Sequence, residues 1–167
     1  MKNHDVVCSE HDHKHLTLAK VKAKQELKTL SADCPFCKIA SGKTEASIVY
    51  EDVNILAFMD LSPGNVGHTL VVTREHYENI YEVPEKLLAE MAAVVKRVCV
   101  AVKKTVDADG IKVIQLNGVA AGQVVMHIHI HVIPTVSKAD AVTGHRGRLT
   151  PEKNELDETA RKIRENL

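Results

Sequence analysis

The segment VMHIHIHVIP, residues 125–134, decides the fold, because three histidines occupy every second position of an otherwise apolar run. Successive side chains of a β-strand point to opposite faces of the sheet. His127, His129 and His131 would therefore lie on one face of the sheet. Ile128, Ile130 and Val132 would enter the core on the other face. The segment predicts a strand that carries a row of three imidazoles.

Three roles are open for such a row. Histidine has an ordinary pKa of about 6.5, so near pH 7 it serves as a nucleophile when neutral and as a proton donor when charged. A His-x-His pair on a strand is also a common way to bind a metal ion. Alternating polar residues can equally be the solvated face of a half-buried strand. The row alone does not choose among catalysis, metal binding and simple exposure.

Composition limits the classes of function. The chain has 167 residues, with 22 basic and 22 acidic side chains, so its net charge does not favour binding to nucleic acid or to an anionic membrane. No apolar run approaches the 18 or more residues of a membrane span, and no secretory signal is recognisable. These features predict a cytoplasmic protein, with no nucleic-acid or membrane partner, that acts on small molecules.

Three regions follow from the pattern along the chain. Residues 1–31 form a polar, histidine-rich tail with a short helix predicted from Leu16 to Leu30. Residues 32–137 hold the strand and helix patterns of a folded domain. Residues 138–167 are a C-terminal extension, in which Thr150 is the expected N-cap of a helix and Pro151 its first residue.

The central region predicts an α+β fold. Its apolar segments indicate a long helix that opens at Pro84 and must pack on a sheet, together with five strands connected in a way that favours an antiparallel arrangement. The predicted strands are residues 48–51, 55–59, 69–72 and 111–116, followed by the histidine strand.

Four segments in a fixed order carry a resemblance to the histidine triad (HIT) superfamily of nucleotide hydrolases and transferases. They are ILAFMDLSP (residues 55–63), GHTLVV (67–72), REH (74–76) and GQVVMHIHIHVIP (122–134). The resemblance extends from about Cys34 to Pro134 and points to the Hint-like branch. It implies a HIT-like fold, with a five-stranded antiparallel sheet that is continuous across a homodimer, and a purine nucleotide as substrate.

The same resemblance implies roles for three histidines. His129 would attack the α-phosphorus and form a covalent nucleotidyl-histidine, which water then hydrolyses. Splitting one displacement into two easier steps is the usual advantage of a covalent intermediate. His131 and His68 would stabilise the charge that develops on the phosphate. No catalytic Mg²⁺ is required.

Further residues match the nucleotide-binding positions of the superfamily. Asp60 resembles the residue that binds the ribose hydroxyls, although a turn role before Ser-Pro-Gly is an alternative. The base slot would be formed by apolar residues that could also be ordinary core, and two amides would bind phosphate oxygens or brace their loop. These residues are Phe36, Ile39 and Phe58 for the base, and Asn117 and Gln123 for the phosphate.

Cys34 and Cys37 have the Cys-x-x-Cys spacing of a metal-binding or redox-active pair. In some branches of the superfamily such a pair binds structural zinc together with two histidines, which correspond here to His76 and His127. Two thiolates and two imidazoles would complete a tetrahedral Zn²⁺ site with no open position. The alternative is a pair of reduced, buried cysteines.

Three functions remain from these observations. The resemblance implies first a nucleoside phosphoramidase, which cleaves the P–N bond between a purine nucleoside monophosphate and an amine. A hydrolase of dinucleoside polyphosphates such as Ap4A or Ap3A would use the same nucleophile. A nucleotide-binding or zinc-dependent interaction protein without turnover is the alternative from another class.

Overall fold

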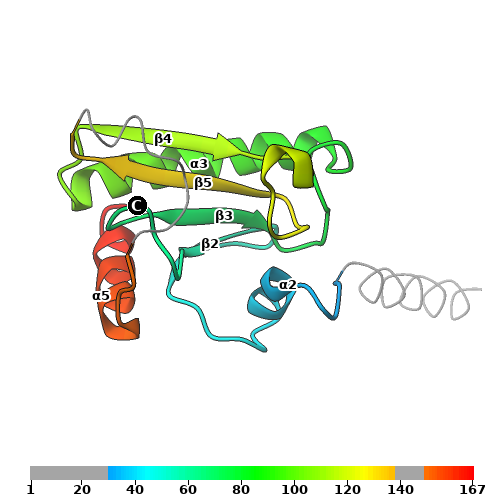
Figure 1. Ribbon diagram of the computed structural model, residues 1–167, viewed down its shortest axis with the longest axis horizontal. Helices are drawn as coiled ribbons and strands as arrows, with labels where there is room; N and C mark the ends of the chain where they lie inside the picture. Colours follow the sequence, from blue (N-terminus) through cyan, green and yellow to red (C-terminus); the bar gives the residue numbers. More distant parts are fainter. Residues whose placement is uncertain (1–29, 138–148) are drawn as a thin grey trace, which may run out of the picture. The chain divides into compact units, whose positions relative to one another are not determined.

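The computed structural model describes residues 30–137 and 149–167. The expected tail helix therefore lies outside the described residues, except for Leu30. The elements, shown in Figure 1, are α2 (Pro35–Ala40), β1 (Ile48–Glu51), β2 (Ile55–Met59), β3 (Thr69–Thr73), α3 (Glu85–Thr105), β4 (Gly110–Gln115), a 3₁₀ turn (Val119–Ala121), β5 (His129–Thr135) and α5 (Lys153–Arg164). None of these helices combines the length and apolar character that crossing a membrane would need.

The five strands form one antiparallel sheet in the order β1-β2-β3-β5-β4. This confirms the predicted α+β class and the predicted sheet. The histidine strand β5 lies between β3 and β4, so its backbone is paired on both sides. Val72 of β3 lies opposite His129, and Leu70 lies opposite His131. The interior place of β5 fixes where its side chains point.

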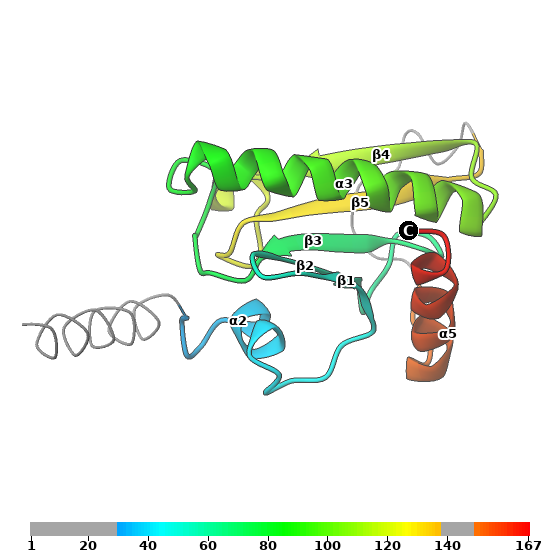
Figure 2. The ribbon, with the colours of Figure 1, turned by 180° about the vertical axis from the view of Figure 1, so that it is seen from behind.

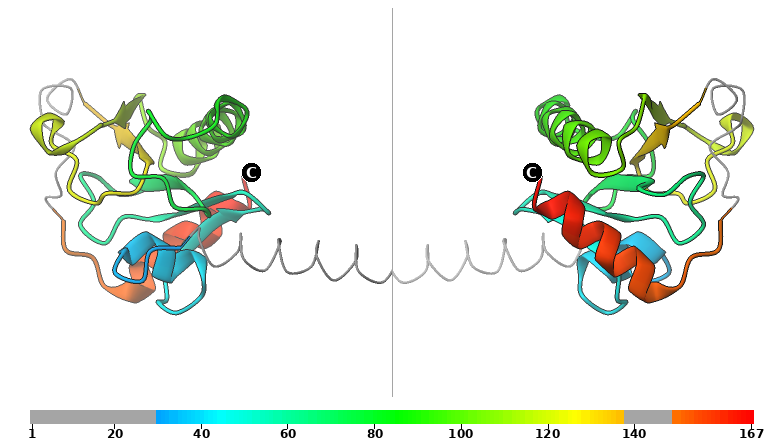
Figure 3. Two further views of the ribbon diagram at one scale, coloured as in Figure 1. Left: turned by 90° about the vertical axis from the view of Figure 1, so that its right-hand side faces the viewer. Right: turned by 90° about the vertical axis from the view of Figure 1, so that its left-hand side faces the viewer.

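The two faces of the sheet bury two different cores. On β2, the side chains of Ile55, Ala57 and Met59 pack in the cluster that includes α3, which covers the sheet in Figure 2. The intervening Leu56 and Phe58 pack with α2 on the opposite face. The end views of Figure 3 show α3 and α2 on opposite sides of the strands. The period-two alternation of a strand therefore separates a structural core from the face that carries the histidines.

The histidine strand is shorter than the sequence pattern predicts. It begins at His129, and residue His127 lies in the bend before it, so the prediction of one strand through all three histidines was wrong. The amide of Ile128 donates to the carbonyl of Tyr77 at 2.7 Å, and the amide of His127 donates to Val125 at 2.9 Å. Because these amides bond to connecting segments, the ladder cannot extend to His127.

The C-terminal helix also begins later than predicted. Its N-cap is Glu152, not Thr150, and Pro151 precedes the helix. The amide of Glu152 donates to the carboxylate of Glu155 at 2.9 Å, as part of a capping box. The reciprocal hydrogen bonds between Glu152 and Glu155 satisfy the free amides at the start of the helix, so no threonine cap is needed and the helix starts later.

One face of α5 is apolar and packs into the main core. Leu156, Ala160 and Ile163 are buried in the same cluster as the long helix α3. At the exposed end, Ser47 donates a hydrogen bond to Asp157 at 2.6 Å and so ties α5 to the segment before β1. The helix is thus part of the main core.

We expect Ile163→Ala to lower the free energy of unfolding by about 3 kcal/mol, because it removes a fully buried side chain and leaves a cavity. Urea unfolding followed by circular dichroism measures the change. The exposed neighbour Lys162→Ala is the control and should change stability by no more than about 0.5 kcal/mol. Equal stability of the two variants would contradict the packing of α5 on α3.

Helix α2 is an element that sequence periodicity does not reveal, because its six residues make fewer than two turns and are too short to show a helical pattern. Cys34 is its N-cap and Pro35 its first residue, where a missing amide hydrogen costs nothing. Phe36 and Cys37 are the buried members. The Cys-x-x-Cys pair is therefore held on one short helical turn, on the histidine face of the sheet.

Candidate active site and adjoining metal centre

A pocket of about 570 Å³ opens on the histidine face of the sheet, between α2 and the start of β5. Its volume lies in the usual range for small-molecule sites. Most of its lining is apolar, and the polar lining includes His129, His131 and Asp60. The pocket thus combines an apolar slot with a group of imidazoles.

The apolar slot is built by α2 and β2. The rings of Phe36 and Phe58 meet edge to face, with centroids 5.4 Å apart. Ile39 lines the same pocket, and Leu70 of β3 contributes to its wall. Such a slot is suited to a flat aromatic ligand. All three residues that were expected at the base position therefore lie together.

Asp60 follows β2 and lies in the pocket wall with a side chain that is 21% exposed. One carboxylate oxygen accepts a hydrogen bond from the amide of Ser62 at 2.8 Å. The other oxygen lies 3.5 Å from Nδ1 of His68. The expected turn contact is thus present, and the residue also borders the pocket.

His129 is the first residue of β5, and only 5% of it is exposed. Its Nδ1 lies 2.7 Å from the backbone carbonyl of His127. A carbonyl oxygen can only accept, so Nδ1 carries the proton and a neutral ring has its lone pair on Nε2. Phe36 packs its ring against this imidazole with centroids 5.3 Å apart. The backbone thus selects the tautomer that a nucleophilic Nε2 requires.

His68 and His131 form a second directed arrangement. The amide of Gly64 donates to Nδ1 of His68 at 3.1 Å, so this nitrogen has no proton when the bond is made. Nε2 of His68 then donates to Nδ1 of His131, at 3.0 Å. A neutral His131 consequently carries its proton on Nε2. In this arrangement His68 accepts at Nδ1 and donates at Nε2, which leaves His131 with a donor at its own Nε2. His131 lines the pocket.

The side-chain amides of Asn117 and Gln123, in the loop between β4 and β5, hold that loop in place. Gln123 is buried, and its side chain accepts from the amide of Gly118 at 2.6 Å while it donates to the carbonyl of Glu78 at 2.6 Å. Asn117 accepts from the amide of Ile80 at 2.8 Å. Of the two predicted roles for these residues, the structure shows the bracing one.

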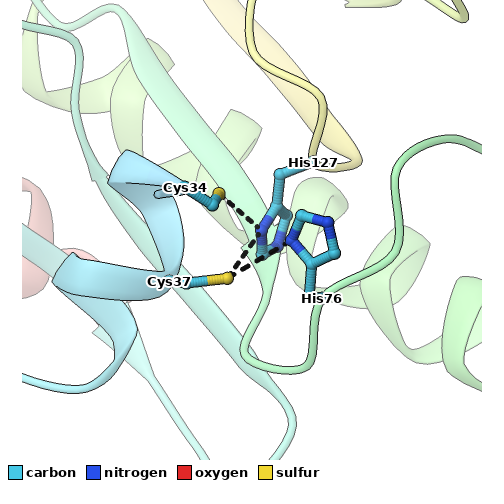
Figure 4. Close-up of side chains that lie close together, drawn as sticks. All are labelled: Cys34, Cys37, His76 and His127. Atoms are coloured by element: carbon cyan, nitrogen blue, oxygen red, sulfur yellow. Dashed lines mark hydrogen bonds between the residues drawn. The ribbon is translucent and has the colours of Figure 1, made fainter. Parts of the chain in front are cut away.

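Four potential metal ligands gather beside the pocket, as Figure 4 shows. Sγ of Cys37 lies 3.3 Å from Nδ1 of His76 and 3.6 Å from Nδ1 of His127, and Sγ of Cys34 lies 3.4 Å from Nδ1 of His127. Zinc bond lengths of about 2.3 Å to sulfur and 2.05 Å to nitrogen imply S···N edges of about 3.6 Å in a tetrahedron. The observed separations fit such a site.

The surroundings of His127 favour the ligand form of its ring. Nε2 lies 2.8 Å from the carbonyl of Thr73, to which it donates, so the lone pair is on Nδ1 and faces the cysteines. Burial lowers the pKa of His127 to about 4, which keeps the ring neutral. Burial raises the pKa of the Cys37 thiol to about 11, so a thiolate there calls for a neighbouring cation.

These four residues come from three distant parts of the chain. The cysteines are on α2, His76 follows β3 and His127 precedes β5. A zinc ion bound to them would supply a structural cross-link, with all four positions taken by protein. The predicted grouping of Cys34, Cys37, His76 and His127 is therefore confirmed as a set of residues that could hold a metal ion.

One contributor to the site left no mark in the sequence pattern. The amide of Gly64 orients His68, but a backbone group has no residue-type signature. Its only indirect signal is the Ser-Pro-Gly turn that places it there.

A family model described as the HIT domain matches residues 41–138. An uncharacterized HIT-like protein of Saccharolobus solfataricus is 44% identical over 105 residues, which are 63% of this chain and 76% of that protein. The adenylylsulfatase HINT3 of Arabidopsis thaliana is 34% identical, over 80% of this chain and 70% of that one. The adenosine 5'-monophosphoramidase HNT1 of Candida albicans is 33% identical, over 68% and 75%.

Solved structures show the same fold. A HIT-like protein from Bartonella henselae superimposes with a TM-score of 0.73 at 34% identity, over 82% of this chain and 98% of that one. A Zn-bound histidine triad family protein from Mycobacterium smegmatis gives a TM-score of 0.70 at 36% identity, over 80% and 92%. The range that the family model matches contains the histidines of the pocket and of the metal ligands, and it begins directly after α2.

Proposed function

The chain belongs to the HIT domain (histidine triad) family, and on this premise we propose that it hydrolyses purine nucleoside phosphoramidates through a nucleotidyl intermediate on His129. The observation that carries the proposal is the bond from Nδ1 of His129 to the carbonyl of His127, because it leaves the lone pair of a neutral ring on Nε2. The pocket beside this ring has the size and apolar lining that a nucleoside needs.

The geometry supports the following sequence of steps. The purine enters the apolar slot that Phe36, Ile39 and Phe58 line, and Asp60 accepts hydrogen bonds from the ribose hydroxyls. Nε2 of His129 attacks the α-phosphorus, the P–N bond breaks, and its electron pair leaves on the amine, which takes up a proton. Water then attacks the phosphorus, releases the nucleoside monophosphate and regenerates the imidazole.

His131 and His68 support the same displacement. The proton that a neutral His131 carries on Nε2 lets it donate to a phosphate oxygen as negative charge develops there. His68 keeps this donor in place through its own bond to His131, and is itself held by Gly64. Because these groups come from the protein, the proposal needs no catalytic Mg²⁺.

Two relatives support the substrate class. One is named an adenosine 5'-monophosphoramidase and the other an adenylylsulfatase. An amine and a sulfate are different leaving groups, so the adenylyl part is what the two names share. A protein that binds the nucleoside and attacks its phosphorus is consistent with both.

We also propose that the metal centre binds one structural Zn²⁺ per chain and that the protein forms a homodimer. The dimer is supported by the edge position of β4, whose outer side has no partner strand in the described part of the chain. Val113 on β4 is 52% exposed, and Val100 on α3 is 61% exposed. Pairing of two β4 edges would cover both an open strand and these apolar side chains.

Turnover of matched substrates tests the proposed reaction. We expect kcat/KM for adenosine or guanosine 5'-phosphoramidate to exceed that for diadenosine tetraphosphate or triphosphate by at least about tenfold, as measured by chromatography of the nucleotide products. Faster cleavage of the polyphosphates would instead assign the site to the dinucleoside polyphosphate reaction. If the protein binds nucleoside monophosphates but turns over none of these substrates, the result would support a nucleotide-binding protein without enzymatic activity.

A further inference from the structure

Two carboxylates line the nucleotide pocket, and the proposed function uses only one of them. Besides Asp60, the wall contains Glu45, in the segment that connects α2 to β1. Its neighbour Ala46 packs against the apolar cluster that includes Phe36 and Phe58. Glu45 thus lines the pocket and is adjacent in sequence to a residue that packs against the aromatic rings of the base slot.

Glu45 is an exposed residue, and its carboxylate makes no hydrogen bond or ion pair with another residue in ranges 30–137 and 149–167. The cationic side chains that share a neighbouring surface groove with it are otherwise engaged. Lys153 pairs with Asp157 at 2.6 Å, and Arg74 pairs with Glu51 at 2.7 Å. Glu45 is thus an acceptor that a ligand can use.

The chemistry of the base edges decides which ligand matches it. An ionised carboxylate accepts hydrogen bonds and donates none. Guanine presents two adjacent donors on its Watson–Crick edge, N1–H and the N2 amino group, and can give both to one carboxylate. Adenine presents one donor beside the N1 lone pair, which faces a carboxylate unfavourably. A paired, charge-assisted contact is among the stronger hydrogen-bond arrangements.

We propose that Glu45 reads the Watson–Crick edge of the base and gives the pocket a preference for guanine nucleotides. The inference rests on the proposed nucleotide site and adds its base specificity. Phe36, Phe58 and Ile39 hold any purine by its faces, so they do not distinguish the two bases. Glu45 is the pocket carboxylate that no other described residue engages, and it supplies the distinction.

Isothermal titration of the full chain with GMP and with AMP tests this proposal. The wild-type protein should bind GMP about tenfold more tightly than AMP. Glu45→Ala should bring the two dissociation constants together. Glu45→Gln should favour AMP, because a carboxamide offers one acceptor and one donor, the pattern that is complementary to adenine. Glu85→Gln on α3, an exposed carboxylate outside the pocket, should keep the wild-type ratio.

The outcomes separate this inference from the proposed function. Equal affinity of the wild-type protein for the two nucleotides, or a guanine preference that survives Glu45→Ala, overturns the role of Glu45 and leaves the nucleotide site in place. Binding of neither nucleotide overturns the proposed site and this inference together. Thermal denaturation of each variant confirms that the exposed substitutions leave the fold intact.

Discussion

His129→Ala is expected to lower kcat/KM for a nucleoside phosphoramidate by about 10⁴-fold or more, because no covalent nucleotidyl intermediate can form without this imidazole. The dissociation constant for a nucleoside monophosphate should change by less than about fivefold, since in the proposed binding mode the base slot and Asp60 hold the nucleoside. Steady-state kinetics and isothermal titration measure the two quantities. A large loss of turnover with binding retained is the signature of a nucleophile.

His131→Ala is the matched comparison, because it removes an imidazole from the same strand. Loss of a charge-stabilising donor should cost about 10²- to 10³-fold, less than loss of the nucleophile. Acid-quenched wild-type protein should gain the mass of a nucleotidyl group on the peptide that contains His129. Wild-type turnover by the His129→Ala variant would contradict the proposed mechanism.

Cys34→Ser is expected to reduce bound zinc from one ion per chain to nearly none and to lower the stability of the protein markedly. A ligand present at about 1,000 times its dissociation constant stabilises the folded state by about 4 kcal/mol. For a domain of this size, loss of that term corresponds to a fall in Tm of about 10 °C. Elemental analysis measures the metal, and calorimetry measures Tm.

Cys99→Ser on α3 is the control, because this thiol is half-buried and lies outside the group of four metal ligands. It should keep one zinc per chain. A chelator should bring wild-type Tm down to that of the Cys34→Ser variant and leave the variant unchanged. Purified wild-type protein that contains no zinc and gains no stability when zinc is added would refute the metal centre.

The strands were the elements predicted most reliably from the sequence, because each buried face of the sheet requires apolar side chains at alternate positions. The residues of β2 divide between two cores as their positions predict. The pattern failed at His127, where alternation continues but the backbone has left the ladder, and the next amide, that of Ile128, donates to the carbonyl of Tyr77. Side-chain periodicity reports which face a residue would occupy and says nothing about which backbone amide finds a partner.

The metal ligands and the histidines of the pocket were predicted from spacing and family resemblance, and the structure brings the ligands together. The tautomers of His68 and His129 were not accessible from sequence. They depend on the Gly64 amide and the His127 carbonyl, which every residue type offers equally. The start of α5 was also misplaced, because threonine is by residue type the better N-cap and only the reciprocal contact between Glu152 and Glu155 makes Glu152 the cap.

Phe36 joins the two centres of the protein. Cys34 and Cys37, on either side of it in the chain, face the other two metal ligands, His127 and His76. The ring of Phe36 contacts His127 at 5.8 Å and His129 at 5.3 Å between centroids. A zinc ion bound to these ligands would hold α2 in this position and, with it, the wall of the proposed base slot. Because linkage between two binding equilibria is reciprocal, any factor by which zinc tightens nucleotide binding is the factor by which nucleotide tightens zinc binding. In a cell, the concentration of free zinc would thereby affect how tightly the protein binds nucleotide, and the concentration of nucleotide would affect how tightly it binds zinc.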